Sequence, residues 1–265
     1  MAPGRVPPDE GEHAAPKAKA GAATRHPVPV GIDAPILEVM ASMRAMRRLR
    51  PDPVPEDLLE QIVEAGTWAP SANHLQRYAF VVVTDRDQIA RLATIWQAVV
   101  RFYRATFLAV PRPDLEPEQF RRTLDAVDYQ AAHFAETPAV IVACYDFGSY
   151  PNTVRRRMLR APAAFRRFGG RRTIAMLRNI GTVTDRSEAA SIYPAVQNVL
   201  LAARSLGLAA NLTTWHLMAE GEVKRVLGIP RRTHTYALIP LGWPMGTFGP
   251  VRRKPAGQMI HRDRW

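Results

Sequence analysis

This sequence has almost no cysteine and no long hydrophobic run. Its 265 residues include one cysteine, Cys144, which excludes a disulfide within the chain and a cysteine-based metal site. Cys144 lies in the apolar run 139–145, where we expect it to pack rather than to react. No apolar run approaches the ~20 residues that a membrane-spanning helix needs. A hydrophobic signal core is also missing near the N-terminus, so we expect a cytoplasmic protein.

Several common motifs are missing as well. No Gly-x-Gly-x-x-Gly segment follows an apparent strand, so a Rossmann-type nicotinamide site is unsupported. The nucleophile elbow Gly-x-Ser-x-Gly does not occur. His216 and Glu220 are four residues apart and would share a helical face, but no further ligand set accompanies them. We therefore expect no metal site.

What the chain does have is a soluble composition with excess positive charge. Hydrophobic residues make up 47% and charged residues 23%, which is typical of a globular protein. The length suffices for one large domain with a full core. Lysine and arginine number 36 against 24 acidic residues, giving a formal charge of +12. This balance favours anionic partners, namely a phosphorylated cofactor, nucleic acid or an acidic membrane surface, without choosing among them.

The first 31 residues differ from the rest. Residues 1–31 are rich in Pro, Ala, Gly and charge and show no periodicity, so we predict a disordered tail there and one domain over 32–265. Order should begin at Asp33 as a helix N-cap. The residues of the first helix that fall at helical spacing, and should be buried, are Ile36, Val39, Met40 and Met43.

The remaining pattern alternates between helices and buried strands. Apolar runs at 78–84, 138–145 and 235–242 predict core strands, and 209–213 a shorter one. Helical spacing predicts helices after 55, after 85, from Pro117 and over 220–227. The clearest helix covers 192–206, has a broad apolar face and is expected to be central. This alternation predicts a one-domain α/β or α+β sandwich.

Three stretches carry the chemistry of binding. Four arginines occur within seven residues at 44–50, just before Pro51-Asp-Pro-Val-Pro55. Arginine forks match pairs of phosphate oxygens. A second basic cluster, Arg252-Arg253-Lys254-Pro255, lies near the far end, and the segment Pro70-Ser-Ala-Asn-His-Leu-Gln76 lies between them.

In order and spacing, these stretches resemble those of the nitroreductase-like family of FMN enzymes, over about residues 36–265. The resemblance implies a mixed, largely antiparallel sheet flanked by helices, in a homodimer whose flavin sites lie at the subunit interface. It implies FMN as cofactor and NAD(P)H as electron donor. The implied function is an NAD(P)H oxidoreductase that reduces a small electron-poor substrate, nitroaromatic- or quinone-like, by ping-pong hydride transfer through flavin N5. No residue is assigned as proton donor.

The resemblance also implies flavin contacts. Arg44 and Arg48 match the family's basic contacts, Ala45 and Met46 contribute mainly backbone, and Arg252 and Arg253 close over the phosphate. We expect Arg47 and Arg50 to be surface charges. The segment that reaches the flavin across the dimer interface matches Pro70, Ser71, Ala72, Asn73, His74 and Gln76. In this segment His74 stands where the family has Asn, and Arg77-Tyr78 where it has Pro-Trp. Further flavin-lining positions are Ile192, by its backbone, and Thr213, Thr214 and Trp215.

Residues 151–184 form an arginine-rich segment without a single acidic residue. Pro162 and Gly169-Gly170 divide it into short basic amphipathic pieces, which we interpret as an insertion or lid. One alternative is that it attracts NADPH phosphates or an acidic substrate, and another is a plain solvated surface. A third is a non-enzymatic protein that binds nucleic acid or an acidic membrane through this segment. Other flavin chemistry, such as dehalogenation or dehydrogenation, also fits the same fold.

Overall fold

The structure of the chain is a computed structural model. It describes residues 35–110, 115–146, 148, 153, 156–158, 160 and 162–265. The predicted tail at 1–31 and the expected N-cap Asp33 lie outside the described residues.

Four strands form one antiparallel sheet in the order β1-β2-β4-β3. The strands are β1 (Tyr78–Val83), β2 (Ala139–Tyr145), β3 (Ala209–Ala210) and β4 (His234–Gly242). In the central pair Ile141 lies opposite Ile239, and the register shifts once, between Ala143 and Cys144. The predicted α+β fold with an antiparallel sheet is confirmed, and the three longer strands fall where the apolar runs placed them.

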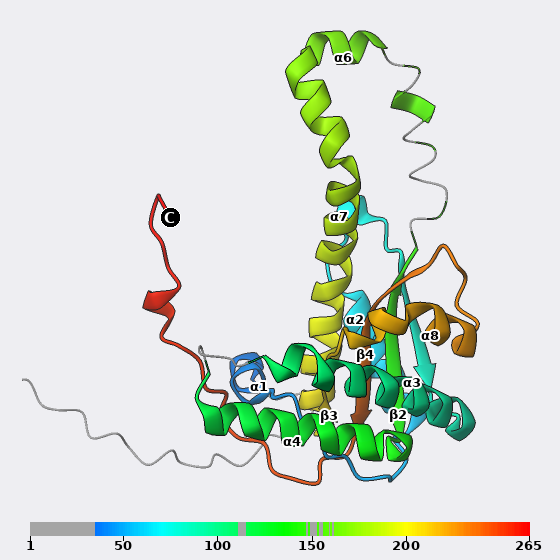
Figure 1. The fold of residues 1–265 in the computed structure, drawn as a ribbon, viewed down its shortest axis with the longest axis vertical. Helices are drawn as coiled ribbons and strands as arrows, with labels where there is room; N and C mark the ends of the chain where they lie inside the picture. The colour runs from blue at the N-terminus through cyan, green and yellow to red at the C-terminus, as the bar shows by residue number, and fades with distance from the viewer. Residues whose placement is uncertain are drawn as a thin grey trace, which may run out of the picture.

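Helices cover both faces of this sheet (Figure 1). One face packs against α2 (Glu56–Thr67) and α7 (Gly170–Ser205), and the other against α3 (Arg86–Ala105), α4 (Pro117–His133) and α8 (Glu220–Leu227). Because side chains alternate along a strand, Ile141 and Ala143 enter the first core and Val140 and Val142 the second. Strand β2 is therefore buried on both faces, as its uninterrupted apolar run predicts.

Local signals set the ends of several helices. The Asp85 side chain accepts a hydrogen bond of 2.8 Å from the backbone N–H of Gln88 and caps α3. Helix α8 ends at Gly228, whose φ of 66° lies in the left-handed region that glycine tolerates. Short 3-10 turns are η1 (Ala72–His74), η2 (Phe107–Ala109), η3 (Phe134–Glu136), η4 (Trp215–Ala219) and η5 (Ala256–Gln258).

Helix α1 (Ile36–Ser42) corrects one expectation. Of its predicted buried face only Val39 is buried, whereas the side chains of Ile36 and Met40 are exposed. Helical spacing identified the apolar side of α1, but no described part of the chain packs over most of it.

Helix α7 corrects a second expectation, that the arginine-rich segment consists only of short pieces. The arginine-rich segment does break at Gly169, where φ is 88°, between α6 (Pro162–Phe168) and α7. Beyond Gly170, however, α7 continues for 36 residues without interruption, roughly 54 Å, into the predicted core helix. Its first half stands out from the body, with α6 lying across its end (Figure 1). We call α6 together with residues 170–187 the arm, and the sheet with the helices that cover its two faces the body.

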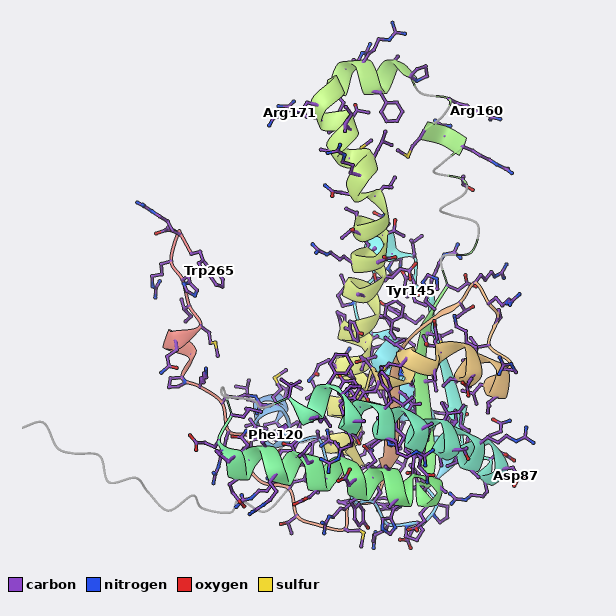
Figure 2. All side chains as sticks on the ribbon, viewed as in Figure 1. Asp87, Phe120, Tyr145, Arg160, Arg171 and Trp265 are labelled. Atoms are coloured by element: carbon purple, nitrogen blue, oxygen red, sulfur yellow. The ribbon has the colours of Figure 1, made fainter. Side chains whose placement is uncertain are left out.

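Glu188 marks the base of the arm, where α7 enters the body. Its buried carboxylate accepts hydrogen bonds from His234 Nδ1, at 2.7 Å, and from the Tyr236 hydroxyl. At the other end of the chain, residues after Pro250 lead away from the body to an exposed Trp265 (Figures 1 and 2). Among the described helices, none is both long enough and apolar enough to cross a bilayer.

Candidate flavin site

The two basic clusters from opposite ends of the chain lie side by side. Residues 43–50 run alongside the segment that follows β4, with a hydrogen bond of 2.8 Å from the Arg50 N–H to the Trp243 carbonyl. A second, also 2.8 Å, runs from the Val251 N–H to the Ala41 carbonyl. This pairing places Arg252 and its neighbours next to the segment that carries Arg44.

Most arginines of these clusters point outward. Arg44 is exposed beside Gly249. The Arg48 guanidinium lies 4.6 Å from the centre of the Tyr129 ring, in cation–π contact. Arg50 is exposed and pairs with Asp52 at 3.5 Å, in keeping with the expected surface role. Arg252 and Arg253 are exposed too, Ala45 is exposed and Met46 is half-buried.

Arg47 contradicts its expected role as a surface charge. It is half-buried, and burial lowers the pKa of its guanidinium. It lines a cavity of about 150 Å³, together with Trp96, Val127, Gln130, Asn211, Leu212, Thr213, Thr214 and Trp215. A signal for this was present in the sequence: side chains alternate in extended chain, so Arg47 shares the inward side of Leu49 while Arg48 and Arg50 point outward.

The cavity wall is rich in hydrogen-bond donors. Gln130 and Asn211 are both buried, and Gln130 Nε2 donates to Asn211 Oδ1 at 2.8 Å. Within the described residues, Asn211 Nδ2 and Trp96 Nε1 have no partner. An unpaired buried donor costs about 1–3 kcal/mol, so these groups favour a ligand that brings acceptor oxygens or nitrogens. Sequence reasoning did not find Gln130 or Asn211, because an isolated amide carries no local signal of burial.

Flat aromatic side chains border the same cavity. Trp215 stacks on Tyr103 with ring centres 3.8 Å apart and also lies 5.9 Å from Trp96. The backbone N–H of Trp215 donates to Thr213 Oγ1 at 3.3 Å, which fixes the turn at the strand end. Of the predicted flavin-lining residues, Thr213, Thr214 and Trp215 therefore share one cavity with a basic side chain.

The loop Pro70–Gln76 has an unusual backbone. Asn73, His74 and Gln76 have φ values of 51°, 54° and 48°, so three non-glycine residues occupy the left-handed region within four positions. Such conformations cost about 1–3 kcal/mol each and cluster at functional sites. The exposed side chains of His74 and Gln76 contact each other, with their Nε2 atoms 2.6 Å apart. Ser71 supports the loop by accepting a hydrogen bond of 3.0 Å from the Gln76 N–H.

This loop lies against α7 rather than at the Arg47 cavity. The Ala72 N–H donates to Ser191 Oγ at 3.1 Å. The neighbouring Ile192 is fully buried inside α7, so within one chain neither its side chain nor its backbone is exposed to a ligand. Among the described residues of one chain, the predicted site thus falls into two groups: the basic segments with Thr213–Trp215, and the Pro70–Gln76 loop with Ile192.

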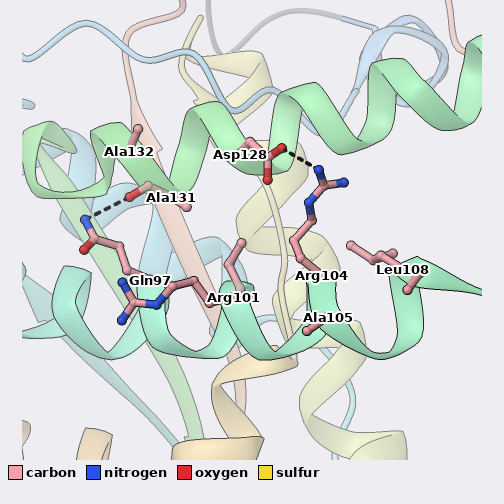
Figure 3. Close-up of a pocket in the computed structure, with 10 residues that line it drawn as sticks. Gln97, Arg101, Arg104, Ala105, Leu108, Asp128, Ala131 and Ala132 are labelled. Carbon is pink, nitrogen blue, oxygen red and sulfur yellow. Dashed lines mark hydrogen bonds and ion pairs between the residues drawn. The ribbon is translucent and has the colours of Figure 1, made fainter.

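A larger cavity, of about 730 Å³, lies between α3 and α4 and contains none of the predicted residues. Figure 3 shows that two of its polar side chains are already engaged. Arg104 pairs with Asp128 at 3.3 Å, and Gln97 Nε2 donates to the Ala131 carbonyl at 3.2 Å. We assign it no role in binding the cofactor.

Known proteins share this architecture. The model of the nitroreductase family matches residues 40–243. A Methanothermobacter thermautotrophicus protein, named NADH dehydrogenase/NAD(P)H nitroreductase, is 24% identical over 233 residues, covering 87% of each chain. Nitroreductase A of Vibrio parahaemolyticus has a TM-score of 0.58 and 20% identity, covering 87% of this chain and 75% of its own. NADPH:FMN oxidoreductase of Vibrio harveyi, solved with NAD+, has a TM-score of 0.57 and 19% identity, with 87% and 77% covered.

Proposed function

This chain belongs to the nitroreductase family, and from that premise we propose that it is an FMN-dependent oxidoreductase that uses NAD(P)H to reduce a small electron-poor substrate. The observation that carries the proposal is the cavity where Arg47 meets Thr213, Thr214 and Trp215. Two segments more than 160 residues apart in the sequence converge there, and each contains residues matched to flavin contacts, although the first contributes Arg47 rather than the matched Arg44 and Arg48. We place the activity in the cytoplasm.

The donor set of this cavity fits one part of a flavin. The pyrimidine edge and the phosphate of FMN are rich in acceptors, and Arg47 and the unpaired Asn211 Nδ2 are donors. The Trp215 ring offers a flat apolar neighbour to a flat ring system. Arg44, Arg252 and Arg253 are proposed to hold the phosphate at the adjoining surface, where exposed side chains are free to close on it.

The size of the cavity supports a site that is shared between two subunits. Ligand pockets usually measure about 300–1,000 Å³, and the single-chain cavity reaches only about 150 Å³. The loop Pro70–Gln76 has three non-glycine residues in the left-handed conformation, which is typical of functional sites, yet it lies against α7 and apart from this cavity. Exposed apolar residues suited to a homodimer interface occur on α1 and in the C-terminal segment, at Ile36, Leu37, Met40, Met259, Ile260 and Trp265.

A bound flavin would supply the hydride-transfer chemistry. The chain's own contribution is electrostatic. A half-buried Arg47 holds a positive charge where water is partly excluded, which stabilises negative charge on a nearby ligand more strongly than an exposed arginine does. Trp215 and Tyr103 exclude water from one side. We assign no side chain as proton donor.

The first test is an absorption spectrum of the purified full chain, with FMN added if needed, before and after anaerobic NADPH or NADH. We expect flavin bands that bleach with one of the two donors. A protein that neither carries nor takes up FMN contradicts the proposal.

The substitution Arg47→Gln then tests whether FMN binds in the cavity that Arg47 lines. Loss of a charge-assisted hydrogen bond, worth about 1.5–3 kcal/mol, should weaken FMN binding roughly 10- to 150-fold. The matched control is Arg50→Gln, at an exposed arginine of the same segment, and it should change the affinity little. Arg253→Ala tests the phosphate contact in the same titration. Equal effects of the Arg47 and Arg50 substitutions would show that flavin does not enter this cavity.

A further inference from the structure

The arm, together with residues 151–161 that precede it, carries most of the chain's excess charge. Residues 151–184 hold nine arginines and no lysine or acidic residue, so they account for nine of the twelve excess positive charges. The described members are Arg156, Arg157, Arg160, Arg166, Arg167, Arg171, Arg172 and Arg178. We call α6 and the start of α7 the tip of the arm, and four of these arginines lie on it: Arg166, Arg167, Arg171 and Arg172. Figure 2 shows Arg171 at the tip and Arg160 on the segment that precedes it.

This charge is not compensated within the described part of the chain. Ion pairs occur on the body, where Arg104 meets Asp128 and Arg121 and Arg122 meet Glu118, but none involves an arginine of the arm. Crowded like charges repel one another and destabilise a compact arrangement. A polyanionic partner would remove this repulsion.

The arm also has an apolar side. Phe168 is 47% exposed, and Ile174, Leu177 and Ile180, spaced three apart, are 54%, 50% and 40% exposed. Arg171 and Arg178 are three and four residues from Ile174, so they border this apolar side at Ile174. Exposed apolar residues beside a basic face are typical of helices that lie in the headgroup region of an anionic membrane. Phosphates of a nucleic acid would use the arginines and leave the apolar side uncovered.

The shape of the arm suits a flat surface. Its helix stands clear of the body, and α6 lies across its outer end (Figure 1). A bilayer can therefore contact α6 and the start of α7 without touching the body. The apolar residues proposed for the dimer interface, on α1 and the C-terminal segment, are separate from this tip.

We propose that the tip of the arm docks the protein on an anionic lipid surface. The arginines contact headgroup phosphates, and Phe168 and Ile174 enter the interfacial region. The contact is peripheral, and no part of the arm spans the bilayer.

Vesicle flotation of the full chain tests this, with phosphatidylcholine vesicles that contain or lack phosphatidylglycerol. We expect binding only to the anionic vesicles, weakened by salt. Each basic residue near such a surface strengthens binding about fivefold, so the double substitution Arg166→Ala/Arg167→Ala should weaken it roughly 25-fold. The matched control, Arg121→Ala/Arg122→Ala, removes the same charge from α4 and should have an effect of about twofold or less.

Phe168→Ser separates lipid from other polyanions. It should weaken vesicle binding about tenfold, through lost apolar burial, and leave binding to duplex DNA unchanged.

The proposal is overturned if the wild-type protein does not bind anionic vesicles at low salt, or if the two double variants lose vesicle binding equally. It is also overturned if duplex DNA binds while vesicles do not. Far-UV circular dichroism verifies folding, and since vesicle binding needs no flavin, its failure is separate from failure of the proposed enzyme activity.

Discussion

The two halves of α7 use similar residues in opposite surroundings. From Ile192 onward, the apolar side chains of Ala195, Val196 and Val199 are fully buried between α2 and the sheet. In the arm, Ile174 and Leu177 repeat at equally helical spacing and remain about half exposed. One continuous helix therefore shows that apolar periodicity determines which side of a helix is apolar, and that tertiary contacts determine whether that side is covered.

The largest expected difference comes from one substitution made in both halves. Ile192→Ala should cost about 2–5 kcal/mol of unfolding free energy, because it leaves a cavity in a fully buried site. Ile174→Ala should cost about 0.5 kcal/mol or less, because its side chain already contacts water. Urea unfolding of both variants measures this. Equal losses would mean that the arm is packed as tightly as the body.

Lowering the pH should reduce the free energy of unfolding of the body and leave the positive charge on the arginines of the arm unchanged. His216 is buried, and burial, opposed in part by nearby Glu220, lowers its pKa from 6.5 to about 4. The unfolded chain therefore binds the extra proton first, so this contribution to stability is complete above pH ~6.5 and is lost as the pH falls toward 4. We expect a loss of about 2 kcal/mol between pH ~7 and pH ~5.

His216→Gln tests the assignment of this pH dependence. The variant should unfold at nearly the same urea concentration at both pH values, apart from the contribution of other groups. If the variant keeps the pH dependence of the wild-type stability, groups other than His216 cause it. Arginines stay protonated across this range, so vesicle binding by the arm should persist until the body unfolds.

A pair of glycine substitutions should change stability in opposite directions. At Gly66 in α2 an added Cβ would lie 2.8 Å from Val199 Cγ2 and 3.2 Å from Phe80 Cζ, so Gly66→Ala should destabilise by about 1–2 kcal/mol. At Gly181 in the arm nothing lies within 4 Å, and Gly181→Ala should stabilise the helix by up to about 1 kcal/mol. Urea unfolding measures the first effect, and amide hydrogen exchange around residue 181 the second. Destabilisation at Gly181 would reveal a close neighbour there.

Most of the fold could be predicted from the sequence, because its elements depend on local signals. The apolar runs at 78–84, 138–145 and 235–242 became strands, and helix α8 covers the predicted residues and ends at Gly228. Two predictions failed for the same reason. The exposed side of α1 and the unbroken length of α7 depend on what packs against each helix, which no local pattern contains.

The site was less predictable, because it is assembled from distant segments. Of the predicted positions, Thr213, Thr214 and Trp215 line the cavity, whereas Arg44 and Arg48, preferred among the arginines at 44–50, do not, and the inward-facing Arg47 does. That choice depended on which side of an extended segment faces the body. The amides of Gln130 and Asn211 meet across 81 residues, and only the packing of α4 beside the strand end brings them together.

The single cysteine makes this protein convenient for site-specific chemistry. Cys144 is 1% exposed in the middle of the sheet, and burial raises the pKa of its thiol to about 11. Maleimides and iodoacetamides react with accessible thiolates, so the folded chain should resist them without any cysteine being removed. A cysteine introduced at Gly181 would then be the one reactive position. A fluorophore or spin label attached there would report directly on the surroundings of the arm and on its contact with a lipid surface.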